Sequence, residues 1–310
     1  MHVRTLTSLT ALAAVLTLGT AAHAATPVPP LLFTSDSGGD LELHRMAADG
    51  SVRALTANRV EDFGGVWSPD GRTIAFVSNR DGDDEIFTMR ADGTGLRQLT
   101  RNTVLRSGVP VMDHAPAWSP DGKHLAFVSN RDGGEMEVYR MRADGSAQVR
   151  LTRTARHVSD HTPSWSPGGG FIFFNSDRVS YDNVEIFRMR WDGTAVTRIT
   201  RTAAGVDDNA PDVSPDGRRI VFSSTRSQGQ HDLFTMAADG TDVRRLAGDL
   251  TLDDVFPKWT PDGRSVVFST FAGPEGVPSA DVWAVRSDGT ERRRLTSPAT
   301  QDSAPDPAPR

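Results

Sequence analysis

Residues 113–152 read DHAPAWSPDGKHLAFVSNRDGGEMEVYRMRADGSAQVRLT, and this stretch decides the fold. Residues 115–118 predict a short strand, and Ser119-Pro120-Asp121-Gly122 places Pro second and Gly fourth, as a type I turn prefers. Further strands are expected at 124–129, 137–142 and 147–151, and Asp144-Gly145 between the last two is a hairpin signal. Four antiparallel strands of about five residues form one blade of a β-propeller.

The same pattern occurs six times along the chain. The copies begin at Asp62, Asp113, Asp160, Asp208, Asp254 and Asp302, at spacings of 51, 47, 48, 46 and 48 residues. A repeat of this length with two turn signals is typical of propellers. One small sheet cannot bury both of its faces, so the copies must stack around an axis.

The first copy lacks its opening strand. Residues 31–35, 41–46 and 52–55 match the second, third and fourth strands, whereas residues 302–306 repeat the opening strand alone. We therefore predict that the end of the chain supplies the innermost strand of the first blade, which closes the ring and removes an exposed sheet edge. The predicted fold is an all-β, six-bladed propeller over residues 31–307, with a tail at 308–310.

The first 24 residues have the pattern of a secretory signal peptide. Arg4 precedes an apolar stretch at residues 6–18, and Ala22-His23-Ala24 is a small-residue cleavage pattern. We expect cleavage after Ala24, a short lead-in at residues 25–30, and an exported product in the periplasm or outside the cell. No later stretch is apolar for long enough to insert into a membrane.

Composition excludes several kinds of chemistry and partner. The chain has no Cys, which rules out disulfides, thiolate metal sites, a thiol nucleophile and a lipid anchor on an N-terminal Cys. The net charge is −6, and loss of Arg4 with the leader makes it one unit more negative. An acidic protein of this kind is not expected to bind nucleic acid. We expect a monomer.

Loop lengths indicate where binding takes place. The Ser-Pro-Asp-Gly and Asp-Gly turns are short, whereas the opposite face carries connections of variable length, at residues 78–84, 101–112 and 270–281. Variable loops on a rigid scaffold are common binding sites. We therefore place the working face there.

The repeats resemble a known family. WSPDG at 67–71, IAFVSNRDG at 74–82 and MRADGTGLRQLT at 89–100 are similar to the repeats of the TolB-type, WD-like propeller. The resemblance covers residues 31–307 and implies a non-catalytic platform for a protein or peptide, because TolB belongs to the periplasmic Tol-Pal system and its propeller binds the peptidoglycan-associated lipoprotein. An envelope lipoprotein is thus one expected partner, and a glycan is a second class. TolB carries an α/β domain before its propeller, where this chain has residues 25–30. Similar repeats also occur in propellers of serine peptidases and of sugar-cleaving proteins.

The opening Asp of each copy is a candidate for the working face, since six such carboxylates would ring the channel mouth. In blades two to five an Arg follows at a fixed distance, which predicts four ion pairs that hold the loops: Asp62 with Arg80, Asp113 with Arg131, Asp160 with Arg178, and Asp208 with Arg226. Ala272 and Ser37 occupy the Arg position for Asp254 and Asp302, so the repeat encodes no partner for these two carboxylates.

Across the ring, His114 and His161 follow the opening Asp of blades three and four. We therefore expect a polarised mouth, acidic at the closure seam and titratable on the far side. The predicted binding residues are Asp62, Asp113, His114, Asp160, His161, Asp208, Asn209, Asp254, Asp302, Arg80, Arg131, Arg178 and Arg226.

Other repeated residues are expected to be structural. Trp67, Trp118, Trp165 and Trp259 share one blade position, where large apolar packing between blades explains them. The segment Asp81-Gly82-Asp83-Asp84-Glu85 lacks the Asp-x-Asp-x-Asp-Gly pattern of a calcium loop and is expected to be solvated.

The sequence predicts neither a catalytic residue nor a metal or cofactor, because it has no Gly-x-Ser-x-Gly elbow, His-Glu-x-x-His helix or phosphate loop. The alternative is a carbohydrate-active propeller enzyme, a polysaccharide lyase or hydrolase. Its site would be a carboxylate pair at the mouth or a metal held by His114, His157, His161 or His231.

Overall fold

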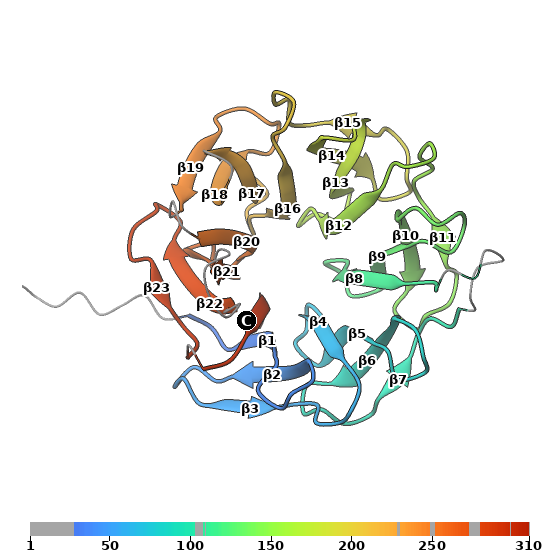
Figure 1. Ribbon diagram of the computed structural model, residues 1–310, viewed down its shortest axis with the longest axis vertical. Helices are drawn as coiled ribbons and strands as arrows, with labels where there is room; N and C mark the ends of the chain where they lie inside the picture. Colours follow the sequence, from blue (N-terminus) through green and yellow to red (C-terminus); the bar gives the residue numbers. More distant parts are fainter. Residues whose placement is uncertain are drawn as a thin grey trace, which may run out of the picture.

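Six four-stranded antiparallel sheets surround a common axis, each with its strands in order from the axis outward (Figure 1). The structure is a computed structural model, which describes residues 28–102, 108, 110–227, 230–248, 252–272, 280–297 and 299–309. The predicted signal peptide, residues 25–27 and parts of the variable loops lie outside these ranges. Within them, no helix is long and apolar enough to cross a membrane.

Blade one combines both ends of the chain. Its innermost strand is β24 (Asp302–Pro307), which pairs with β1 (Leu31–Ser35), and β2 (Glu42–Met46) and β3 (Val52–Ala54) follow outward. In Figure 1 the C-terminus lies next to β1 near the axis. The predicted closure is confirmed.

The remaining blades follow the chain in order. Their strands are β4 (Asp62–Trp67), β5 (Thr73–Ser78), β6 (Glu85–Arg90) and β7 (Arg97–Gln98); β8 (Asp113–Trp118), β9 (His124–Ser129), β10 (Glu137–Arg142) and β11 (Val149–Arg150); β12 (Asp160–Trp165), β13 (Phe171–Ser180), β14 (Asn183–Arg190) and β15 (Thr197–Arg198); β16 (Asp208–Val213), β17 (Arg219–Ser227), β18 (Gln230–Ala237) and β19 (Arg244–Ala247); β20 (Leu252–Trp259), β21 (Ser265–Ala272), β22 (Ala280–Arg286) and β23 (Arg293–Arg294).

The core lies between neighbouring blades. The second strand of every blade carries a Phe that is at most 2% exposed, and these are Phe33, Phe76, Phe127, Phe174, Phe222 and Phe268. Trp67 shows how the repeat packs, since it lies in one cluster with Leu32 and Leu43 of blade one and Ile74 and Phe76 of its own blade. Each blade thus covers the face that its neighbour would otherwise expose to water.

Candidate functional site

The four predicted ion pairs are present, and their carboxylates are buried. The Arg Nη2 to carboxylate distances are 2.7 Å for Arg80–Asp62, 2.5 Å for Arg131–Asp113, 2.7 Å for Arg178–Asp160 and 2.6 Å for Arg226–Asp208. Each of these Asp side chains is 0% exposed, while each Arg retains some contact with solvent. Burial raises the pKa of Asp160 and Asp208, although their arginines oppose the shift. These carboxylates therefore hold loops and do not line an open channel mouth.

Aromatic rings fix the arginines in place. Arg178, for example, lies 5.1 Å from the ring centre of Phe174 and 4.7 Å from that of Phe187. The guanidinium thus combines an ion pair with cation–π contacts to the second and third strands of its blade.

Asp254, for which the repeat encodes no partner, pairs with an arginine from another part of its blade. Arg292, which precedes the outermost strand β23, donates from Nη2 to both oxygens of Asp254 at 2.8 and 3.1 Å. Its guanidinium lies over Phe268 and Trp283, the same place that the loop arginines occupy in other blades. The fold therefore conserves the position of the cation in space, while a different part of the chain supplies it.

Blade one has a histidine near the equivalent position. Asp302 is 3% exposed, and its charge acts on His44, whose ring lies 5.7 Å from that of Phe33. Burial lowers the pKa of His44 and outweighs the opposing effect of Asp302. Because Asp254 is paired and both Asp254 and Asp302 are buried, these two carboxylates do not present free acidic groups at the seam.

A left-handed residue interrupts the innermost strand of every blade. These residues are Gly64, Ala115, Thr162, Ala210, Phe256 and Ala304, with φ between 45° and 60°, and the strand register shifts at each of them. A left-handed conformation costs a non-glycine residue about 1–2 kcal/mol. Bulges of this kind are enriched beside functional sites, where they redirect side chains. Here they form one layer around the axis.

This layer lines a central cavity of about 370 Å³. All six innermost strands contribute to its wall, which is mostly apolar and includes Pro116, Pro163, Pro211, Pro257 and Pro305. Phe256 also lines it and is 42% exposed. A concave apolar site with a few polar groups is the usual form of a ligand pocket.

Among the predicted binding residues, His114 lines the cavity. Its Nε2 lies 2.7 Å from Asp84 Oδ2, and its ring meets that of Phe63 edge-on at 5.7 Å. His161 of the adjacent blade has an exposed side chain and does not line the cavity, and the surrounding protein lowers its pKa, to which His114 contributes. Asn209 accepts a hydrogen bond from Asn175 at 3.0 Å. Of the two predicted histidines, His114 therefore lies at the cavity wall.

Sequence reasoning missed a charged group at the deeper end of the channel. Lys258 Nζ lies 3.4 Å from Asp212 Oδ1, and both Lys258 and Asp306 line the cavity. Burial raises the pKa of Asp306 to about 6, against the opposing effects of Lys258 and of the Trp67 amide, which donates to it at 2.7 Å. Burial also acts against the charge of Lys258, but Asp212 and Asp306 outweigh it and its pKa is raised. The sequence did contain a signal for this charged group. Lys258, Asp212 and Asp306 stand four residues after the opening Asp of their blades, where three other blades have the uncharged residues Val66, Ala117 and Ser164.

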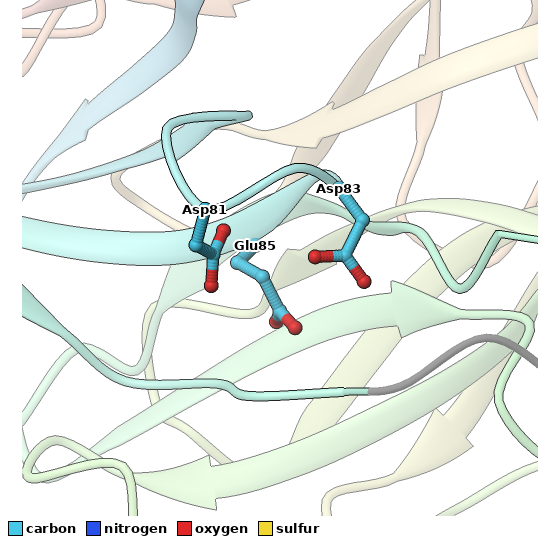
Figure 2. A group of neighbouring side chains, drawn as sticks. All are labelled: Asp81, Asp83 and Glu85. Atoms are coloured by element: carbon cyan, nitrogen blue, oxygen red, sulfur yellow. The ribbon is translucent and has the colours of Figure 1, made fainter.

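The histidines do not assemble into a metal site in the described residues. His157 is 75% exposed with its Nδ1 4.0 Å from Glu135, and His231 is bound to Asp253 at 3.0 Å. One cluster of potential ligands does occur in the described part of the chain, formed by Asp81, Asp83 and Glu85 (Figure 2). Within the described ranges, none of the four predicted histidines belongs to a group of three or more potential metal ligands.

Comparison with known proteins gives the family. Residues 100–309 match the family described as TolB beta propeller domain. A TolB homolog of Chlorobium luteolum is 38% identical over 34% of this chain and 21% of its own length, and dipeptidyl-peptidase 5 of Porphyromonas gingivalis is 34% identical over 27% and 12%. The solved TolB structure from Acinetobacter baumannii has a TM-score of 0.75 at 21% identity, covering 91% of this chain and 67% of that one. The chain spans less than half the length of the curated relatives that it matches, 43% at most. Non-enzymes and enzymes are thus both among its relatives.

Proposed function

Because this chain belongs to the TolB beta propeller domain family, we propose that it is an exported, non-catalytic binding platform for a protein or peptide of the cell envelope. The observation that carries the proposal is the apolar cavity of about 370 Å³ to which all six blades contribute. Relatives named Tol-Pal system protein TolB point to the envelope, and an envelope lipoprotein is one partner of this class.

The cavity suits the tip of a peptide segment. Its backbone is held rigidly by the left-handed residues and by the prolines that follow five of them, so little ordering is needed when a partner binds. Phe256 offers an exposed aromatic surface, and aromatic residues often dominate binding energy in such pockets. His114 supplies a polar group at the rim, while Lys258 and Asp306 supply charges further in.

The Asp–Arg pairs act as positioning residues in this proposal. Each ties the start of an innermost strand to the segment that follows the second strand of its blade. In blade six, Asp254 is tied instead to Arg292, which precedes the outermost strand.

The test is affinity capture from a solubilised envelope fraction, with wild type and two aromatic variants compared side by side. Phe256→Ala installs the residue that blades one, three and five carry at this position, so the fold is expected to remain intact. We expect it to weaken capture of the partner at least tenfold, since an aromatic anchor is worth about 2 kcal/mol or more. Tyr181→Ala removes an aromatic that is 86% exposed on a loop and is expected to have no effect.

Two results would contradict the proposal. Equal capture by Phe256→Ala and wild type would exclude the cavity as the binding site. Shortening of a polysaccharide by the purified protein would favour the enzyme alternative.

The titratable side of the mouth has its own test. Replacing His114 and His161 together with Ala is expected to change the pH dependence of capture between about pH 5 and 7. An unchanged pH profile would remove both histidines from the binding site.

A further inference from the structure

A cluster of three carboxylates lies in the loop between β5 and β6 of blade two. The carboxylate oxygens of Asp81, Asp83 and Glu85 all lie within 4.8 Å of one another. Figure 2 shows the three side chains on the same side of the loop, with Glu85 between the other two. Asp81 is exposed, Asp83 is half-buried and Glu85 is 0% exposed, so the cluster leads from solvent into the blade.

Comparison between blades shows that the cluster lacks a cation that its counterparts in blades three to six have. Blade one lacks it too, since Ala54 holds the arginine position there and Asn58 donates to Glu42. In blades three to six, an arginine of the outermost strand pairs with the carboxylate equivalent to Glu85. These pairs are Glu137 with Arg150 at 2.6 Å, Glu185 with Arg198 at 2.5 Å, Asp232 with Arg245 at 2.8 Å, and Asp281 with Arg294. In blade two the arginine position is Gln98, whose amide donates to Asp81. Asn102 donates to Glu85 from its backbone and side chain, but it brings no charge.

A second observation comes from the opening Asp of the next blade. In blades two, four and five, the arginine donates to both oxygens of this Asp. In blade three, Arg131 donates to Asp113 Oδ2 only and sends its other terminal nitrogen to Gln148. Asp113 Oδ1 is buried without a hydrogen-bond partner in the described structure.

The carboxylate of Asp113 lies beside the cluster. The Asn102 Nδ2 donates both to Glu85 Oε2 at 3.0 Å and to Asp113 Oδ2 at 2.7 Å, so the two carboxylates are neighbours. Burial first, and the charge of Asp113 further, raise the pKa of Glu85 to about 8. Four carboxylates thus meet one guanidinium, that of Arg131, whereas the corresponding carboxylates of blades three, four and five have two arginines.

We propose that Asp81, Asp83 and Glu85, with Asp113 behind them, bind a divalent cation in the place of the missing guanidinium, and that this cation is Ca²⁺. The available donors are carboxylate oxygens, which suit hard cations and not the softer metals that prefer imidazole or thiolate. Ca²⁺ accepts six to eight oxygen ligands in irregular geometry, and the exposed side at Asp81 leaves room for water. Residues 81, 83 and 85 alternate along the loop, which brings their side chains to one side.

The experiment is a calorimetric titration of the chelator-treated protein with CaCl₂ and, separately, with MgCl₂. We expect one saturable Ca²⁺ site with a Kd on the order of 10⁻⁴–10⁻³ M, the range of extracellular modules, and weaker Mg²⁺ binding. Asp83→Asn is expected to weaken Ca²⁺ binding at least tenfold. The matched control is Asp132→Asn. Asp132 follows Arg131 in blade three as Asp81 follows Arg80 in blade two, and this variant is expected to bind Ca²⁺ as wild type does.

Gln98→Arg gives the decisive comparison. It introduces the arginine that blades three to six use, so it is expected to abolish Ca²⁺ binding and to raise the melting temperature of the Ca²⁺-free protein. Absence of saturable binding up to about 10 mM Ca²⁺, which is ten times the weaker Kd expected, would overturn the proposal. Unchanged Ca²⁺ affinity in Gln98→Arg would also overturn it, and tighter binding of Mg²⁺ than of Ca²⁺ would overturn the choice of ion.

Discussion

Replacing Arg178 with Met should destabilise the propeller strongly, because it leaves Asp160 charged and buried. The Nη2 of Arg178 lies 2.7 Å from each oxygen of Asp160, whose side chain is 0% exposed. At this distance and an effective dielectric constant of about 20, the attraction amounts to about 6 kcal/mol. Desolvation of the two charges offsets part of it, so the expected loss in unfolding free energy is about 3–5 kcal/mol.

The loss should depend on pH in a definite direction. Burial already raises the pKa of Asp160 above its ordinary value, and loss of the arginine raises it further. A group with a raised pKa in the folded state binds a proton more tightly there than in the unfolded chain, so the penalty is small below the unfolded pKa and grows as pH rises. Arg178→Met should therefore approach wild-type stability near pH 4 and fall furthest below it above pH 7.

The assay is urea unfolding followed by circular dichroism at several pH values, with thermal melts in parallel. A loss of 3–5 kcal/mol corresponds to a fall in melting temperature of roughly 10 °C for a domain of this size. The double variant Asp160→Asn, Arg178→Met should recover most of the loss because no unpaired charge remains. Arg153→Met, at an exposed position, is the control and should change the free energy by less than about 0.5 kcal/mol. A loss below about 1 kcal/mol at pH 7, or one that does not vary with pH, would refute the reasoning.

Three further predictions concern the ring as a whole. Deleting residues 301–310 removes β24 and the hydrogen bond that the Trp67 amide donates to Asp306, so the truncated protein should melt far below the full chain. Equal melting temperatures would refute closure of the ring by this strand. Gly145→Ala should lower the free energy of unfolding in urea by about 1–3 kcal/mol, since φ is 82° and a Cβ would lie 2.7 Å from the Leu99 carbonyl oxygen. Gly50→Ala, where φ is 84° but the space is open, should lower it less. Equal losses would show that the close approach to Leu99 is unimportant. Burial raises the pKa of Asp306 to about 6, so the folded state binds this proton more tightly and the free energy of unfolding should fall as pH rises from about 4 to 6. Asp306→Asn should flatten this part of the stability profile in urea unfolding. An unchanged profile would show that another group causes the pH dependence.

The sequence by itself determined the parts of the structure that repeat locally. The turn residues, the strand lengths and the spacing of the copies specify one blade after another. The single opening strand at residues 302–306 specifies how the ring closes. The four Asp–Arg pairs were also predictable, because both partners lie at fixed positions within one repeat.

Only the tertiary structure decided which departures from the repeat act together. Arg292 reaches Asp254 from 38 residues away because the blade fold brings the outer strand to the aromatic pair that cradles a guanidinium. The cavity exists because six bulged strands meet around one axis, and the charges of Lys258 and Asp306 interact across neighbouring blades. Electrostatic and packing energies depend on distance in space, and a repeat alignment records only distance along the chain.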